Sequence, residues 1–164
     1  MSDASIVVDL AGQRLRLLQD GELQAEYVVS TARNGAGERE GSECTPRGRH
    51  VICEKIGANA PVDAVFVARL PTGERWSPQL AVAHPDRDWI LTRILWLDGC
   101  EEGRNRGGEV DTKCRYIYIH GTPDTEPLGR PLSHGCIRMR NRDVIELFER
   151  VTVGTPVDII EEAK

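Results

Sequence analysis

The N-terminal half of the chain alternates apolar and polar residues in short runs, a pattern typical of β-strands. Residues 14–17 alternate arginine with leucine, and residues 23–29 place an apolar side chain at every second position. Between these runs stands Asp20-Gly21, a pair that favours the tight turn of a β-hairpin. Two further strands are predicted, at residues 6–10 and 49–53. This half of the chain is therefore predicted to be mostly β.

The C-terminal half begins with strand patterns of two kinds. Residues 89–97 are almost all apolar and favour a buried strand, although their length leaves a helix open. Tyr116, Tyr118 and His120 alternate with isoleucines, which predicts a strand that ends at His120. A last short strand is predicted at residues 157–160.

One helix is predicted near the C-terminus. Asn141 is a favoured capping residue, and Asp143 suits the first turn of a helix. The apolar residues that follow recur at the spacing of one helical face: Val144, Leu147, Phe148 and Val151. The chain is therefore predicted to be mostly β, of the α+β class, with one helix packed beside the strands.

Length, composition and charge limit the class of protein. The 164 residues match one ordinary domain, so a single domain over residues 1–164 is expected. The longest nearly apolar stretch is far shorter than the roughly 18 residues of a membrane-spanning helix, so no span is expected. A net charge of −5 argues against broad binding of nucleic acid. A peptide or small molecule is the expected partner, and the oligomeric state is not indicated.

The first residues and the cysteines favour a cytoplasmic location. The chain does not open on a basic segment followed by an apolar one, and the alternative is a periplasmic or cell-wall protein whose signal was removed. Five cysteines cannot all pair, so reduced thiols are expected. A bridge between Cys100 and Cys114 stays open, and the polar loop 99–113 between them is interpreted as solvated, with a lid over the substrate as the alternative.

The residues that carry chemistry fall in two short segments, His120-Gly121-Thr122 and Ser133-His134-Gly135-Cys136. A cysteine thiol is mostly protonated at neutral pH, so a nucleophilic Cys136 needs a base such as His120. Gly135 leaves the backbone open to a substrate, and the N–H groups of Gly135 and Cys136 are candidate donors to an oxyanion.

Two other interpretations of these residues stay open. A cysteine and a histidine this close are also common in ordinary protein cores. A zinc site would draw on Cys100, Cys114, His120, His134 and Cys136. The chain lacks the paired Cys-x-x-Cys spacing of such sites, and a single residue between His134 and Cys136 crowds chelation, so no metal is expected.

The two segments resemble the signature of the L,D-transpeptidase catalytic domain of the YkuD type. The resemblance covers Ile119-His120-Gly121-Thr122 and Ser133-His134-Gly135-Cys136-Ile137-Arg138-Met139. It is supported by Thr45-Pro46-Arg47-Gly48, similar to the family's Thr-Pro-x-Gly turn, and by Gly154-Thr155-Pro156-Val157 near the end. It implies a sandwich-like mixed sheet with one packed helix, and peptidoglycan stem peptides or muropeptides as substrates, without a cofactor.

The resemblance also implies roles for single residues. Cys136 is the implied nucleophile and His120 the general base, with the Gly121 carbonyl holding the other ring nitrogen. His134 and Gly135 support the site geometry or the oxyanion. Ser133 is implied to hydrogen-bond near the substrate, and Arg138 to meet a substrate carboxylate or, equally, to form a structural salt bridge.

The sequence does not settle whether water or an amine is the acyl acceptor. The implied reaction is attack by Cys136 at the carbonyl of an L-centre, with release of the terminal D-alanine and formation of a thioester. A cytoplasmic protein would transfer the acyl group to water, which makes it an L,D-carboxypeptidase of murein recycling. The alternatives are an exported L,D-transpeptidase that forms cross-links and a peptidoglycan-binding module without activity.

Overall fold

The computed structural model describes residues 3–162, which form one ten-stranded sheet and two helices. The strands are β1 (Ala4–Asp9), β2 (Arg14–Gln19), β3 (Glu22–Ser30), β4 (Gly48–Ile56), β5 (Ala64–Val67), β6 (Leu70–Arg75), β7 (Ile90–Gly99), β8 (Tyr118–Thr122), β9 (Ile137–Arg140) and β10 (Pro156–Ile160). The helices are α1 (Pro78–Ala83) and α2 (Asn141–Arg150), with a single 3₁₀ turn at Gly108–Val110. None of the described helices is long and apolar enough to cross a membrane.

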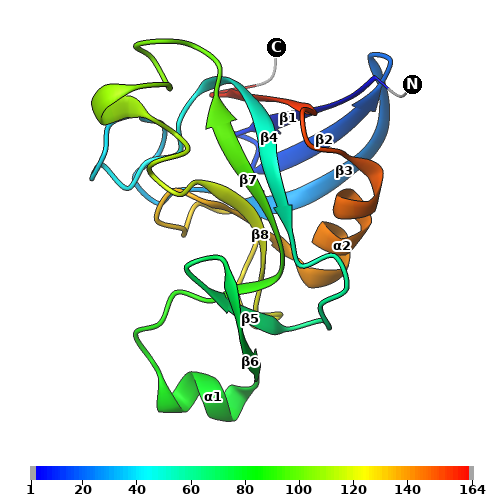
Figure 1. Cartoon of the computed structure of the whole chain (residues 1–164), viewed down its shortest axis with the longest axis vertical. Coiled ribbons are helices and arrows are strands. Elements are labelled where there is room, and N and C mark those ends of the chain that lie inside the picture. Colours follow the sequence, from blue (N-terminus) through cyan, green and yellow to red (C-terminus); the bar gives the residue numbers. More distant parts are fainter. Residues whose placement is uncertain (1–2, 163–164) are drawn as a thin grey trace.

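The sheet is mixed and closes on itself. Its strand order is β4-β10-β1-β2-β3-β9-β8-β7-β5-β6, and β4 also pairs with β7, which joins the two ends of the main body. Strands β1 and β10 are parallel, as are β8 and β9, and the other pairs are antiparallel. The β5–β6 hairpin and α1 project from this body at the bottom of Figure 1. The predicted mixed sheet is confirmed.

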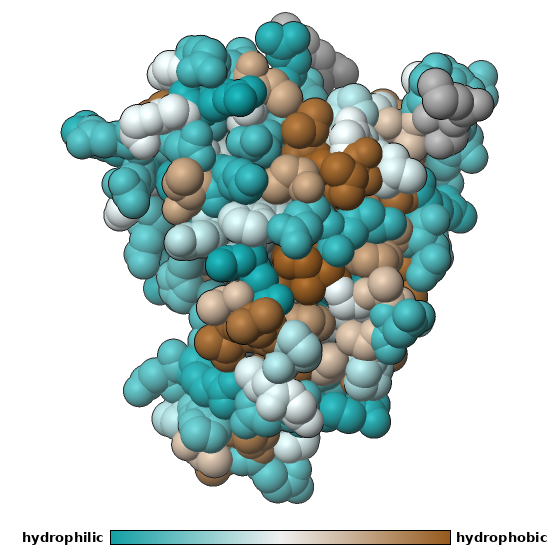
Figure 2. Space-filling model, in the orientation of Figure 1, coloured by the Kyte–Doolittle hydropathy of each residue, from teal (hydrophilic) through white to brown (hydrophobic). Residues whose placement is uncertain are grey.

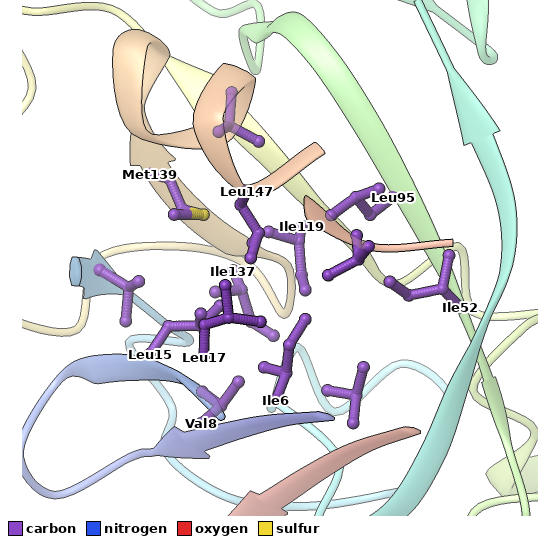
Figure 3. Packing of buried hydrophobic residues seen from close by; sticks show 14 of the residues in the cluster. Ile6, Val8, Leu15, Leu17, Ile52, Leu95, Ile119, Ile137, Met139 and Leu147 are labelled. Atoms are coloured by element: carbon purple, nitrogen blue, oxygen red, sulfur yellow. The ribbon is translucent and has the colours of Figure 1, made fainter. Parts of the chain in front are cut away.

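The alternating patterns of the sequence build the core. Side chains from the inner faces of the strands meet those of α2, as Figure 3 shows for residues labelled there. The fully buried ones include Ile6, Leu15, Ile52, Leu95, Ile119, Ile137, Met139 and Leu147. Each buried aliphatic side chain contributes about 1.5–3 kcal/mol relative to an exposed one. The face in Figure 2 is mostly hydrophilic, with apolar residues in small patches.

The predicted hairpin and buried strand are confirmed. Strands β2 and β3 pair across Asp20 and Gly21, whose φ angles of 53° and 81° suit a two-residue turn between twisted strands. Residues 89–97, for which a helix was left open, form most of β7. This long strand pairs with β4, β5 and β8, and β8 pairs in turn with β9, which directly follows Cys136.

The predicted end of the His120 strand is wrong. Strand β8 begins at Tyr118 and continues to Thr122, because Gly121 and Thr122 still pair in parallel with β9. His120 therefore lies in the middle of a strand. Tyr116 precedes the strand in a turn, with a left-handed φ of 57°, and its side chain is 53% exposed.

The predicted cap of α2 is also wrong, although its apolar face is confirmed. Asn141 is the first residue of the helix, and the capping position belongs to Arg140, which makes no capping hydrogen bond with its side chain. The Asn141 side chain is buried instead, where its Oδ1 accepts from Thr92 Oγ1 at 2.6 Å and its Nδ2 donates to Asp63 Oδ1 at 3.0 Å. Tertiary partners have taken over a side chain that local preference assigns to the helix end.

The β5–β6 hairpin and α1 were not predicted, because neither has a clear apolar pattern. Helix α1 has no buried residue, and its start is marked by Ser77, whose Oγ accepts from Leu80 N–H, and by Pro78 in the first turn. A Ser-Pro pair favours the start of a helix, so the sequence does indicate where this helix begins.

Candidate active site

A cavity of about 470 Å³ brings the two predicted segments together. It opens between the start of β8, the segment just before β9 and the tip of the β5–β6 hairpin. Its lining includes His120, Ser133, His134, Cys136 and Arg138 from the predicted set. In the parallel pairing of β8 and β9, His120 is the register partner of Arg138, which places the imidazole beside the strand that follows Cys136.

The His120 ring has one nitrogen engaged and one free. Its Nδ1 lies 2.7 Å from the Gly121 carbonyl oxygen, which only accepts hydrogen bonds, so Nδ1 carries the proton. Among residues 3–162 the buried Nε2 has no hydrogen-bond partner. Burial lowers the pKa of His120 below its ordinary value, so the ring is neutral at neutral pH. The free lone pair at Nε2 can therefore take a proton from a nucleophile.

Close packing fixes the carbonyl that orients this ring. A Cβ at Gly121 would overlap Asn141 Oδ1 and lie 2.6 Å from the Leu91 carbonyl oxygen, so only glycine fits. Asn141 is itself held by the Thr92 hydroxyl. Thr92 lies where the pairing of β7 with β8 shifts register, and its φ of 76° is unusual for a β-branched residue. The base thus rests on a buried polar network.

The Cys136 thiol is held in its protonated form. Its S–H donates to the Tyr116 carbonyl oxygen at 3.4 Å, and its sulfur accepts from Tyr118 N–H at 3.3 Å. Burial raises the pKa of Cys136 to about 12. The resting site therefore holds a neutral thiol and a neutral imidazole in one cavity, and the Tyr118 N–H already donates to the sulfur.

Hydrogen bonds hold the turn that presents Cys136. Ser133 Oγ donates to the Cys136 carbonyl oxygen at 2.6 Å and accepts from Gly135 N–H at 3.2 Å. The Thr45 hydroxyl donates to the Gly135 carbonyl oxygen at 2.9 Å, so the Thr-Pro turn supports this loop directly. Gly135 has a φ of 133°, and a Cβ there would come within 3.1 Å of Ile117 Cδ1. The positive φ and these close contacts both favour glycine at this position.

These bonds change the expected oxyanion donors. Because Gly135 N–H already donates to Ser133, it is not free for a substrate. No acceptor for the Cys136 N–H is found in the part of the chain that the structure describes. Of the two predicted donors, Cys136 N–H is thus the one without a partner among the described residues.

His134 and Arg138 both line the cavity but differ in exposure. His134 is exposed. Arg138 is 11% exposed in its side chain and forms an ion pair with Asp88 at 3.2 Å. The structure therefore shows the predicted salt bridge of Arg138 and places the residue at the cavity wall, while contact with a substrate carboxylate stays a prediction.

Several lining residues were not found from the sequence. The Arg115 guanidinium donates to the Cys44 carbonyl oxygen at 2.7 Å and so ties the 37–44 loop to the cavity wall. Arg69 comes from the tip of the β5–β6 hairpin, and Asp88 from the segment before β7. Only the tyrosines had a signal, since the alternation through Tyr118 and His120 placed their side chains on one face.

The structure bears on both other interpretations of the cysteines, a disulfide bridge and a metal site. All five cysteines are free thiols, and Cys100 and Cys114 are exposed. Within residues 3–162 no three His, Cys, Asp or Glu side chains gather closely enough to hold a metal ion. The loop 99–113 packs against the start of β4, where Asn105 Nδ2 donates to the Arg47 and Arg49 carbonyl oxygens, and it does not line the Cys136 cavity.

Comparison with known proteins places the chain in a family. The family model for the L,D-transpeptidase catalytic domain (YkuD) matches residues 3–159. YqjB of Bacillus subtilis (strain 168), named as an L,D-transpeptidase, is 45% identical over 160 residues, which cover 98% of this chain and 73% of YqjB. YbiS of Escherichia coli (strain K12) is 50% identical over 48 residues, which cover 29% of this chain but only 16% of YbiS.

Solved structures share the fold at low sequence identity. L,D-transpeptidase 3 from Mycobacterium tuberculosis superposes with a TM-score of 0.62 at 17% identity, over 98% of this chain and 62% of that chain. An L,D-transpeptidase from Mycobacterium smegmatis gives a TM-score of 0.60 at 18% identity, over 97% of this chain and 59% of that chain. With the family match over nearly its whole length, the chain belongs to the L,D-transpeptidase family and carries that family's catalytic domain.

Proposed function

We propose that this protein cleaves the bond between an L-centre and the terminal D-alanine of peptidoglycan stem peptides, with Cys136 as nucleophile and His120 as general base. The observation that carries the proposal is the buried, unpartnered Nε2 of His120 in the same cavity as the Cys136 thiol. A buried nitrogen without a partner costs free energy, so its retention points to a proton-transfer role. Family membership supplies the substrate class.

The first half-reaction begins from the neutral pair. As Cys136 Sγ bonds to the scissile carbonyl carbon, its proton passes to His120 Nε2, which requires the S–H to turn away from the Tyr116 carbonyl oxygen. The carbonyl oxygen takes the electron pair and meets Cys136 N–H. When the C–N bond breaks, the imidazolium protonates the leaving amine, D-alanine departs, and a thioester remains on Cys136.

The charge of the cavity favours water as the acyl acceptor. Although the chain has a net charge of −5, the described lining of the Cys136 cavity holds three arginines and a single carboxylate: Arg69, Arg115, Arg138 and Asp88. A positive cavity attracts an acidic stem peptide, and it disfavours a protonated amine next to the thioester. Water attack then makes the protein an L,D-carboxypeptidase that trims muropeptides, as in murein recycling.

A cross-linking L,D-transpeptidase is the second candidate, because the relatives in the family carry that name. The two candidates share the thioester and differ only in what attacks it. Mass spectrometry of a disaccharide-tetrapeptide incubated with the protein, with and without excess D-amino acid, separates them. We expect tripeptide in both samples. Exchanged tetrapeptide or dimers would establish transpeptidation, and equal product from Cys136→Ala protein would overturn the whole proposal.

A further inference from the structure

The tip of the β5–β6 hairpin carries a side chain where the backbone favours glycine. Val67 pairs with Leu70, so the turn consists of Ala68 and Arg69, with φ angles of 49° and 67°. Two successive left-handed residues define a turn in which glycine and asparagine are the usual choices. The chain holds an arginine there instead, and this arginine lines the Cys136 cavity.

Aromatic rings hold the Arg69 side chain in one place. Its guanidinium carbon lies 4.7 Å from the centre of the Trp96 ring and 4.9 Å from that of Tyr116. Its Nη1 donates to the Tyr118 hydroxyl at 3.0 Å. The centres of the Trp96 and Tyr118 rings are 5.9 Å apart in an edge-to-face arrangement, so the rings that contact Arg69 also pack against each other. A stacked guanidinium keeps the donors on its edge available.

The Arg69 charge is not neutralised by an acid. No carboxylate in residues 3–162 forms an ion pair with it, whereas Arg138 on the same cavity is paired with Asp88. One residue connects Arg69 with the nucleophile. Tyr118 bonds Arg69 through its hydroxyl and Cys136 through its backbone N–H, so a single tyrosine separates the guanidinium from the nucleophile.

We propose that Arg69 is a specificity-determining residue that binds a carboxylate of the acyl donor other than the one on the departing D-alanine. This inference rests on the proposed function, because it takes the donor to be a stem peptide. Two carboxylates qualify: the free one on the second residue and the one on the side chain of an acidic diamino acid at the third. Either would meet the planar edge of a preorganised guanidinium in a charge-assisted hydrogen bond.

The test compares acidic and amidated donors. Three tetrapeptides are needed: the parent acid, one amidated at the second residue and one amidated at the third-residue side chain. D-Alanine release is measured with the unaltered protein, Arg69→Gln, Arg69→Lys and the control Arg75→Gln. Arg75 lies on the same hairpin outside the cavity, where its Nε donates to the Val62 carbonyl oxygen. Binding of the same peptides is measured in a Cys136→Ala background, where they are not consumed.

The unaltered protein should prefer the acid over one of the amides by about tenfold or more in kcat/KM and in binding. Arg69→Gln should abolish that preference, Arg69→Lys should keep part of it, and Arg75→Gln should leave it unchanged. The amide that loses affinity identifies the carboxylate. A merely structural role for Arg69 would weaken all three peptides alike and would overturn the inference.

Failure of the proposed function gives a different result. If the unaltered protein releases no D-alanine, the peptidase proposal fails, and Arg69 is judged by binding alone. A preference for the acid that disappears with Arg69→Gln would then still support carboxylate recognition. Equal binding of acid and amides, or an unchanged preference in Arg69→Gln, would overturn it whether or not D-alanine is released.

Discussion

The inner and outer walls of the Cys136 cavity are built on different principles. The inner wall holds His120 through Gly121, Asn141 and Thr92, which are all buried and joined by hydrogen bonds or close contact. The outer wall is charged and reaches solvent, and it depends on ion pairs and stacking, as with Arg69 and Arg138. From this difference we propose that the inner wall determines the chemistry and the outer wall the choice of substrate. Changes to the inner wall should lower kcat and stability, while changes to the outer wall should act on KM.

The largest effect is expected when the base of the inner wall is removed. His120→Asn should lower kcat/KM for D-alanine release by about 10²–10⁴, because a general base contributes a factor of this size. His84→Gln is the matched control, since His84 is exposed and does not line the cavity. Circular dichroism confirms that each variant is folded. Full activity in a folded His120→Asn protein would show that His120 is not the general base.

A single methyl group should damage both stability and rate at Gly121. Gly121→Ala forces a Cβ against Asn141 and the Leu91 carbonyl oxygen, and overpacking of this kind costs about 1–3 kcal/mol. The displaced carbonyl no longer orients His120, so kcat should fall with the urea midpoint. Gly154→Ala serves as comparison, because the Cβ there meets nothing within 4 Å and only its φ of 96° is strained. Unchanged kcat in Gly121→Ala would show that the carbonyl does not position the base.

Acid should lower the stability of the folded chain through two buried histidines, His120 and His50. Burial lowers the pKa of His120, and it lowers the pKa of His50 to about 4. The unfolded chain takes up protons on both rings near pH 6.5 while the folded chain does not, so stability falls as pH drops below about 6.5. Urea midpoints measured from pH 7.5 to pH 4.5 check this. A midpoint that stays constant over that range contradicts the buried, neutral imidazoles.

The pH profile of the reaction follows from the same groups. Activity should rise from acid with a midpoint below about 6.5, as His120 loses its proton, and reach a plateau at neutral pH. Because the pKa of Cys136 is raised to about 12, no second step from thiol ionisation should appear up to about pH 9. A step near neutral pH from Cys136 would instead indicate a preformed thiolate.

The smallest effect is expected at the outer wall. Arg138→Gln breaks the ion pair with Asp88, whose side chain is 46% exposed, so we expect a cost to stability of about 1 kcal/mol and not the several kcal/mol of a fully buried pair. We expect KM to rise several-fold while kcat and the urea midpoint change little. Asp88→Asn leaves the guanidinium in place and should not raise KM in the same way. A large loss of stability with unchanged KM would assign Arg138 to structure alone and erase the contrast between the walls.

The sequence predicts the parts of this molecule that depend on local pattern. The strands around Asp20-Gly21 and the apolar face of α2 repeat with the period of their element, and β7 holds an almost wholly apolar run. The close spacing of Cys136 and His120 likewise suggested one site. What it does not predict depends on contacts between distant segments. Asn141 does not cap the helix but accepts a hydrogen bond from the buried Thr92 on β7. Arg69 lines the cavity although its hairpin has no apolar pattern.

The most direct test of the account is to trap the acyl group on the protein. A tetrapeptide is mixed with the protein, quenched in acid at short times, and the tryptic peptides and free D-alanine are measured by mass spectrometry. We predict an adduct with the mass of the peptide less D-alanine on the segment that holds Cys136, absent from Cys136→Ala and strongly reduced in His120→Asn. Release of D-alanine that survives Cys136→Ala, or an adduct on another of the five thiols, would contradict the account.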